Sequence, residues 1–103
     1  LSIPLAVGIA ITDATLQAVQ NSIQHAGRNA DHYARIKADS KRIKIAIVDN
    51  GKGFHPSRVP SNRLGIRNSI TRRMLSVGGE KPAVISAPRK GTTVTLTWRL
   101  PRD

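Results

Sequence analysis

Two short segments of the chain carry side chains that could bind a ligand or a metal ion. The first, QAVQNSIQHAG, places Gln17, Asn21 and His25 four residues apart, which aligns them along one face of a helix. Asparagine is a poor helix former, and its amide oxygen is a suitable ligand for Mg²⁺, which prefers oxygen. An exposed polar helix face explains the same spacing, so the stripe alone leaves both interpretations open.

The second segment, VDNGKGF, follows an alternating strand and contains Asp49, Gly51 and Gly53. Asn-Gly after alternating apolar residues is typical of a hairpin turn. However, Pro56 and Pro60 follow closely, and each removes a donor from any returning strand. We therefore expect a loop that begins at the end of the strand. The carboxylate of Asp49 would lie beside an opening where the two glycines let a ligand approach the backbone.

Two further segments are compatible with ligand binding but are common in proteins. RLGIRNSI predicts a helix that begins near Gly65, and the free N–H groups of a helix N-terminus hold phosphate well. An ordinary helix start explains this segment equally well. KGT places Thr92 at the start of the last strand, directly after a turn.

Hydrophobic periodicity predicts the elements that must position these residues. Residues 4–26 form one helix and residues 65–77 a second, while strands cover residues 32–38, 42–48, 83–87 and 92–100. We expect a single α+β domain over 1–103, a two-layer α/β sandwich with both helices on one face of a mixed, mostly antiparallel sheet. The predicted inward residues are Leu5, Ile9, Thr12, Leu16, Val19 and Ile23 of the first helix, Ile66, Ile70, Met74, Leu75 and Val77 of the second, and Val94, Leu96, Trp98 and Leu100 of the last strand.

Composition excludes several classes of protein. The chain has no cysteine, which excludes disulfides and thiolate metal sites, and no apolar run approaches the ~20 residues of a membrane span. Its formal net charge of +11 favours anionic partners such as nucleic acid or phosphate. The basic residues are spread along the chain and aromatic residues are scarce, so a solvated basic surface explains the charge at least as well.

The four segments together, in this order, resemble the ATP-binding domain shared by sensor histidine kinases, 90-kDa heat-shock chaperones, type II topoisomerases and MutL proteins. QNSIQHAG is similar to the family's asparagine-bearing helix, DNGKGF to its Asp-x-Gly-x-Gly box, RLGIRNSI to its second glycine box and KGTTVTL to its terminal strand. The short loop between the two glycine boxes looks most like that of bacterial two-component sensor kinases.

The resemblance implies how a nucleotide base would be held. Asp49 would accept a hydrogen bond from the exocyclic amine of adenine. Gly51 and Gly53 would let the purine lie against the backbone, and Thr92 would reach the adenine edge directly or through water.

The resemblance also implies a phosphate side of the site. Asn21 would bind Mg²⁺ that bridges the phosphates of ATP, and His25 would lie near the phosphates. Gly65 and the N–H groups that follow it, Ile66 first, would meet the phosphate tail. Residues 55–64 would form a lid that is mobile without nucleotide.

One position departs from the family pattern. The family usually has a glutamate one turn before the asparagine, where this chain has Gln17, which is neutral and cannot take up a proton. Asp13 lies about 12 Å from Asn21 along a helix axis, too far to substitute. Gln24 replaces a position that is often basic. Cations that could compensate for the lost phosphate contact are Arg28, Lys52 and Arg67.

We therefore expect the ATP-binding catalytic domain of a sensor histidine kinase, a fragment of a longer chain that donates the γ-phosphate of Mg-ATP to a histidine on a separate dimerisation domain. The resemblance implies a response regulator as partner, a membrane-anchored parent with this domain in the cytoplasm, and a monomeric fragment without direct membrane contact. The alternatives are an ATP-binding pseudokinase, suggested by Gln17, and a basic nucleic-acid-binding module, suggested by charge alone. Nucleic-acid binding is not expected under the first hypothesis.

Overall fold

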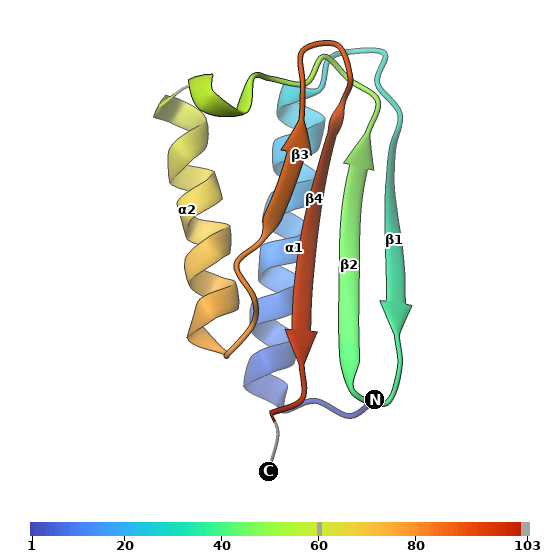
Figure 1. The fold of residues 1–103 in the computed structure, drawn as a ribbon, viewed down its shortest axis with the longest axis vertical. Coiled ribbons are helices and arrows are strands. Elements are labelled where there is room, and N and C mark those ends of the chain that lie inside the picture. Colours follow the sequence, from blue (N-terminus) through green and yellow to red (C-terminus); the bar gives the residue numbers. More distant parts are fainter. Residues whose placement is uncertain (60, 102–103) are drawn as a thin grey trace.

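The computed structural model describes residues 1–59 and 61–101, which form a layer of helices and a sheet (Figure 1). In chain order the elements are α1 (Leu5–His25), β1 (His32–Ala38), β2 (Arg42–Asp49), the short 3-10 helix η1 (Pro56–Arg58), α2 (Ser61–Ser76), β3 (Ala83–Ser86) and β4 (Thr92–Arg99). Within these residues, none of the helices combines the length and the apolar character needed to cross a bilayer.

The strands form a 4-stranded sheet in the order β1-β2-β4-β3, and each neighbouring pair is antiparallel. Both helices α1 and α2 pack on one face of this sheet (Figure 1). The predicted α+β two-layer sandwich is confirmed. The sheet is antiparallel throughout the described strands, so it lacks the parallel pair that a mixed sheet would contain.

The strand register brings the candidate site to one end of the sheet. Asp49 ends β2 and lies opposite His32 of β1 on one side and Thr92 of β4 on the other. The C-terminal end of α1 and the start of α2 reach this same end of the molecule (Figure 1). The loop after β2 was predicted to leave the sheet without forming a hairpin, and the β2 neighbours confirm this.

The hydrophobic core lies between the sheet and the helices. Leu96 and Trp98 of β4 are buried, and Val94 packs against them, as the alternation predicted. Leu100, also predicted to be inward, is 39% exposed, because β4 ends at Arg99. The indole N–H of Trp98 donates to the carbonyl of Val77 at 2.9 Å, which satisfies the one polar atom of this large buried side chain.

The buried face of α1 differs from the predicted one. The helix carries two apolar stripes, and the sheet covers the stripe that contains small alanines, because small side chains let helix and sheet approach closely. Leu5, predicted to be inside, is 80% exposed. The buried stripe consists of Val7, Ile11, Ala14 and Ala18, whereas Leu5, Ile9, Thr12, Leu16 and Ile23 are exposed.

Helix α2 begins at Ser61 rather than near Gly65. An isolated glycine within a helix is tolerated at a cost of about 1 kcal/mol relative to alanine, so Gly65 does not mark the helix start. Ile70 and Met74 are buried as predicted, but Leu75 is 53% exposed. Leu75 follows Met74 directly and is therefore rotated by about 100° from the buried face.

Candidate functional site

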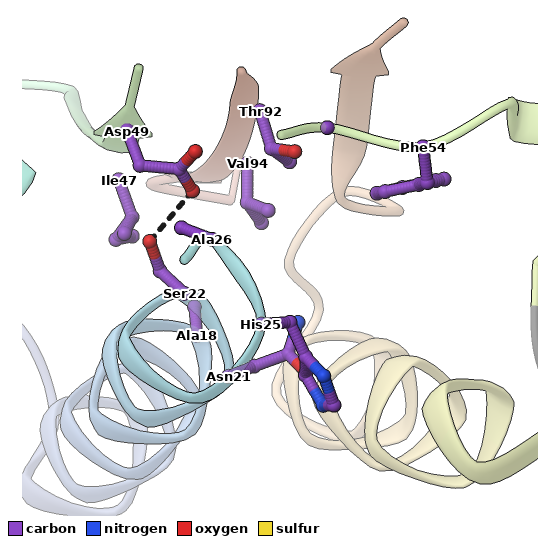
Figure 2. Close-up of a pocket in the computed structure, with 11 residues that line it drawn as sticks. Ala18, Asn21, Ser22, His25, Ala26, Ile47, Asp49, Phe54, Thr92 and Val94 are labelled. Carbon is purple, nitrogen blue, oxygen red and sulfur yellow. Dashed lines mark hydrogen bonds between the residues drawn. The ribbon is translucent and has the colours of Figure 1, made fainter. Parts of the chain in front are cut away.

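The carboxylate of Asp49 is the buried polar centre of the site, and this residue is only 6% exposed. Its Oδ1 accepts the backbone N–H of Gly51 at 2.9 Å, and its Oδ2 accepts the hydroxyl of Ser22 at 2.7 Å (Figure 2). Both partners are donors, so the carboxylate acts here as an acceptor. Each oxygen has two lone pairs and can accept one more hydrogen bond.

Thr92 faces Asp49 across the β2–β4 pairing, and Ser86 fixes its hydroxyl. Ser86 Oγ accepts the N–H of Phe54, donates to the carbonyl of Gly91 and lies beside Thr92 Oγ1, each at 2.9 Å. Because the single proton of Ser86 goes to Gly91, the hydroxyl of Thr92 donates to Ser86. The Thr92 oxygen therefore retains a free acceptor site at the edge of the pocket.

The packing of the loop against the rest of the protein already requires glycine at positions 51 and 53, independently of any ligand. A Cβ on Gly51 would collide with the carbonyl of Ala26, and one on Gly53 would collide with the carbonyl of Ala87. Gly53 also has a φ of 58°, which side chains rarely adopt. Gly53 lines the pocket, whereas the atoms nearest to Gly51 are protein backbone. Their contact with a purine remains a prediction.

A pocket lies beside Asp49, between the C-terminal end of α1 and the sheet (Figure 2). Its enclosed space is about 20 Å³, which holds a single water molecule. A purine can enter only if a lining side chain or the loop moves. The lining residues are Ala18, Asn21, Ser22, His25, Ala26, Ile47, Asp49, Gly53, Phe54, Thr92 and Val94.

Asn21 presents a buried oxygen to this pocket. It follows Ala18 by three residues, so the buried stripe of α1 continues into Asn21 and directs it inward. Its Oδ1 is buried and has no hydrogen-bond partner among the described residues. Leaving a buried acceptor unsatisfied costs about 1–3 kcal/mol. A ligand with a donor group, or a cation, would remove this cost.

A second pocket continues from the first and shares Asn21 with it. Arg67 of α2 and Lys81 of the α2–β3 connection also line it, so an anionic group would meet two cations there. Among the cations that could compensate for Gln24, Arg67 therefore lies at the site. Arg28 and Lys52 line neither of these two pockets.

Gln17 does not line either pocket, although it was grouped with Asn21 and His25 in the predicted polar stripe. Its side chain lies between the two helices. Gln17 Nε2 donates to Ser69 at 3.1 Å, and Gln17 Oε1 accepts from Arg73 Nε at 3.1 Å. Arg73 also contacts Asp13 at 3.4 Å. The Gln17 side chain therefore joins α1 to α2, in a position away from the pocket.

The remaining predicted residues lie in three different environments: the pocket, the surface of α2 and the core. His25 lines the first pocket, on the same side as Asn21 and opposite Asp49 (Figure 2). Gly65 is exposed within α2, where its N–H belongs to the helical hydrogen-bond ladder, and Ile66 packs against the core. The phosphate contacts predicted for these two residues thus require a different conformation of α2.

The predicted lid at residues 55–64 contains η1 and the first turn of α2. Pro60, in the middle of the lid, lies outside the described residues. The mobility of the lid stays a prediction.

Sequence reasoning missed Ser22, Ser86 and Lys81. A serine in the middle of a helix competes for local hydrogen bonds, and this could have drawn attention to Ser22. No local pattern relates Ser22 to Asp49 or Ser86 to Thr92, because these partners meet only through tertiary packing.

The fold and the site define a two-layer α+β domain with two adjoining polar pockets at one end of the sheet, one with acceptor oxygens of Asp49 and Asn21 and the other with the cations Arg67 and Lys81. The family model described as "Histidine kinase-, DNA gyrase B-, and HSP90-like ATPase" matches residues 7–102. The chain belongs to this family, and membership implies ATP binding.

Solved structures of histidine kinases share the fold. The histidine kinase domain of the blue-light activated histidine kinase EL346 from Erythrobacter litoralis matches with a TM-score of 0.76 and 20% identity over 94% of this chain and 49% of that chain. The mycobacterial sensor histidine kinase MprB matches with a TM-score of 0.69 and 19% identity over 87% of this chain and 70% of that chain. The chain thus spans about half the length of the first of these. The comparison with curated proteins gives no match.

Proposed function

We propose that this chain is the ATP-binding catalytic domain of a sensor histidine kinase and that it binds Mg-ATP in the two adjoining pockets. The observation that carries the proposal is the pairing of Asp49, a buried acceptor carboxylate, with Asn21, whose buried oxygen lacks a partner, in one pocket. Family membership and the kinase-like fold support the same conclusion.

The base would occupy the first pocket. The exocyclic amine of adenine is a donor and matches the acceptor sites left on Asp49. Guanine has an oxygen at the equivalent position, which a carboxylate would repel. Thr92, with its free acceptor site, would contact the adenine edge directly or through a water molecule.

The phosphates would extend into the second pocket. Arg67 and Lys81 would contact the phosphate oxygens there, and His25 would lie close to them.

The side chains of the site fit a Mg²⁺ ion that takes one ligand from the protein and the others from phosphate and water. Asn21 supplies an unpartnered amide oxygen, which is a suitable ligand. Among the described residues, no group of three or more His, Cys, Asp or Glu side chains could hold a metal. The other ligands would therefore be phosphate oxygens and water, the usual arrangement for Mg²⁺. A bound Mg²⁺ would neutralise part of the negative charge of the phosphates.

In the parent protein, the γ-phosphate would pass to a histidine on a separate dimerisation domain and from there to a response regulator. We further propose a parent that is anchored in a membrane, with this domain in the cytoplasm and monomeric when isolated. These elements rest on the resemblance of the sequence motifs to those of two-component kinases.

A titration with ADP or a non-hydrolysable ATP analogue, with and without Mg²⁺, tests the proposal. We expect binding in the range of tens to hundreds of micromolar, about −5 to −6 kcal/mol, with tighter binding when Mg²⁺ is present. Amide resonances of residues 48–54 should shift, because the pocket must widen. If nucleotide with Mg²⁺ neither raises the melting temperature nor shifts these resonances, the proposal is wrong.

The position of Gln17 favours a second candidate, an ATP-binding module with impaired catalysis. Gln17 is neutral and is bonded to Ser69 and Arg73 at the helix interface, so it does not face the pockets as a base. Normal autophosphorylation of the full-length wild-type protein would exclude this alternative.

A further inference from the structure

Asp49 is linked to the exposed side chain of His32 through the hydroxyl of Ser22. Ser22 Oγ lies 2.7 Å from Asp49 Oδ2 and 2.9 Å from His32 Nδ1. The three residues come from α1, β1 and β2, and His32 is the direct cross-strand partner of Asp49. The helix therefore places a hydroxyl between two side chains that the sheet register holds side by side.

The number of protons on these groups fixes the direction of both hydrogen bonds. Ser22 has one hydroxyl proton, and an ionised carboxylate can only accept. The proton of Ser22 therefore points to Asp49 Oδ2, and the Ser22 oxygen accepts from His32. It follows that Nδ1 of His32 carries a proton. In the opposite arrangement the hydroxyl proton would point to His32, and no proton would lie between the Ser22 and Asp49 oxygens, which are 2.7 Å apart.

This arrangement bears directly on base selection. While Ser22 donates to Oδ2 and Gly51 donates to Oδ1, each oxygen of Asp49 is held in place by one donor and keeps one acceptor site. Such a carboxylate attracts the amine of adenine and repels the carbonyl of guanine. Without the Ser22 hydroxyl, Oδ2 loses its fixed donor, and the carboxyl group is free to rotate away from the orientation that presents an acceptor to the adenine amine. The discrimination against the guanine carbonyl then weakens, because the two carboxyl oxygens are no longer held in one place.

We propose that Ser22, oriented by His32, is a positioning residue that keeps Asp49 an acceptor and thereby makes the pocket select adenine over guanine. The proposal rests on the proposed function, because it assumes that the base lies against Asp49. It adds two residues that act through Asp49 and do not need to touch the nucleotide themselves.

The affinities of ADP and GDP, each with Mg²⁺, test the role of the hydroxyl. We expect Ser22→Ala to weaken ADP binding about tenfold, because Asp49 is no longer held in the orientation that receives the base, and to lower the ratio of ADP to GDP affinity. Ser22→Thr keeps a hydroxyl and should restore the ratio. Thr12→Ala removes an exposed hydroxyl that bonds within the same helix and should leave both affinities unchanged.

The role of His32 has its own test. His32→Ala removes the donor to Ser22 and should lower the ratio of ADP to GDP affinity. In His32→Asn the side-chain amide N–H can replace Nδ1–H, so this variant should keep most of the wild-type ratio. Nitrogen chemical shifts of the wild-type imidazole provide a test that needs no variant. When the imidazole of His32 carries a single proton, that proton should lie on Nδ1.

The outcomes separate this proposal from the proposed function. If the wild type binds neither nucleotide, both are wrong. If the wild type prefers ADP and Ser22→Ala keeps the same affinities and the same ratio, the role of Ser22 is wrong and the proposed function stands. A neutral His32 with its proton on Nε2 also overturns the proposal, even if Ser22→Ala does not fold.

Discussion

The backbone of Gly51 lies against that of Ala26 so closely that no side chain fits between them. The N–H of Lys52 donates to the carbonyl of Ala26 at 2.8 Å, and the carbonyl of Lys52 accepts the N–H of Arg89 at 2.6 Å. The loop after β2 is thus held between the end of α1 and the β3–β4 turn. These contacts position Asp49 and the pocket beside it.

We expect Gly51→Ala to lower the free energy of unfolding by about 3 kcal/mol, because the added methyl meets a backbone carbonyl that cannot move aside easily. Gly8→Ala is the matched control: its Cβ would make only ordinary contact, and alanine favours the helix by about 0.5–1 kcal/mol. Chemical denaturation measures both variants. Equal stability of Gly51→Ala and wild type would contradict the observed packing.

Asp49→Asn should abolish nucleotide binding, because an amide has one acceptor oxygen where the carboxylate has two. The N–H of Gly51 and the hydroxyl of Ser22 both need an acceptor there. The variant should therefore also lose about 1–3 kcal/mol of stability. Calorimetric titration with ADP and thermal melting without ligand measure the two effects separately. Retained ADP affinity in a folded variant would exclude Asp49 as the base-binding residue.

Arg67→Ala should weaken ATP binding about tenfold and adenosine binding little, because Arg67 lines the pocket assigned to the phosphates. Arg72→Ala removes an equal charge from an exposed position on the same helix and controls for net charge. The difference between the variants should shrink as salt is added. An equal loss for both variants would indicate a general effect of charge.

Gln17→Glu should not by itself create a catalytic base. The new carboxylate would lie beside Arg73, which already bonds Gln17 and Asp13, and would form an ion pair there. We expect stability to change by less than about 1 kcal/mol and autophosphorylation of the full-length protein to stay at the wild-type level. The double variant Gln17→Glu/Arg73→Ala removes the arginine that would hold the new carboxylate. Its autophosphorylation rate is compared with that of Gln17→Glu alone. A rise in activity with Gln17→Glu alone would refute this reasoning.

The turn between β1 and β2 should make a pH-dependent contribution to stability. The N–H of Lys41 bonds Asp39 Oδ1 at 2.8 Å and lowers the pKa of this carboxyl, with a smaller effect from the N–H of Arg42. A lowered pKa in the folded state stabilises the fold above the ordinary pKa of about 4, and this stabilisation disappears as the pH falls through the folded-state pKa. The melting temperatures of wild type and Asp39→Asn should therefore differ at neutral pH and converge in acid. A difference in melting temperature that stays the same at every pH would contradict the proposed contribution of the ionised Asp39 carboxylate.

The strands and their faces could be predicted well from the sequence. The period of two in β4 identified Val94, Leu96 and Trp98 as inward, and β1 has the predicted bounds. Helix α1 was harder, because Leu5 and Ile11 belong to two apolar stripes that both fit a helical period. Only the contact of the helix with the sheet decides which stripe is buried.

The sequence by itself determined the order of the helices and strands and the family, and it predicted the main polar residues of the site, because periodicity and motif spacing are local properties of the chain. The tertiary structure alone decided that Asn21 faces the pocket while Gln17 faces α2, since two positions one turn apart can point to different neighbours. It also brought Ser22 and His32 to Asp49. Such contacts join distant segments, and only the packing of a helix across a registered sheet creates them.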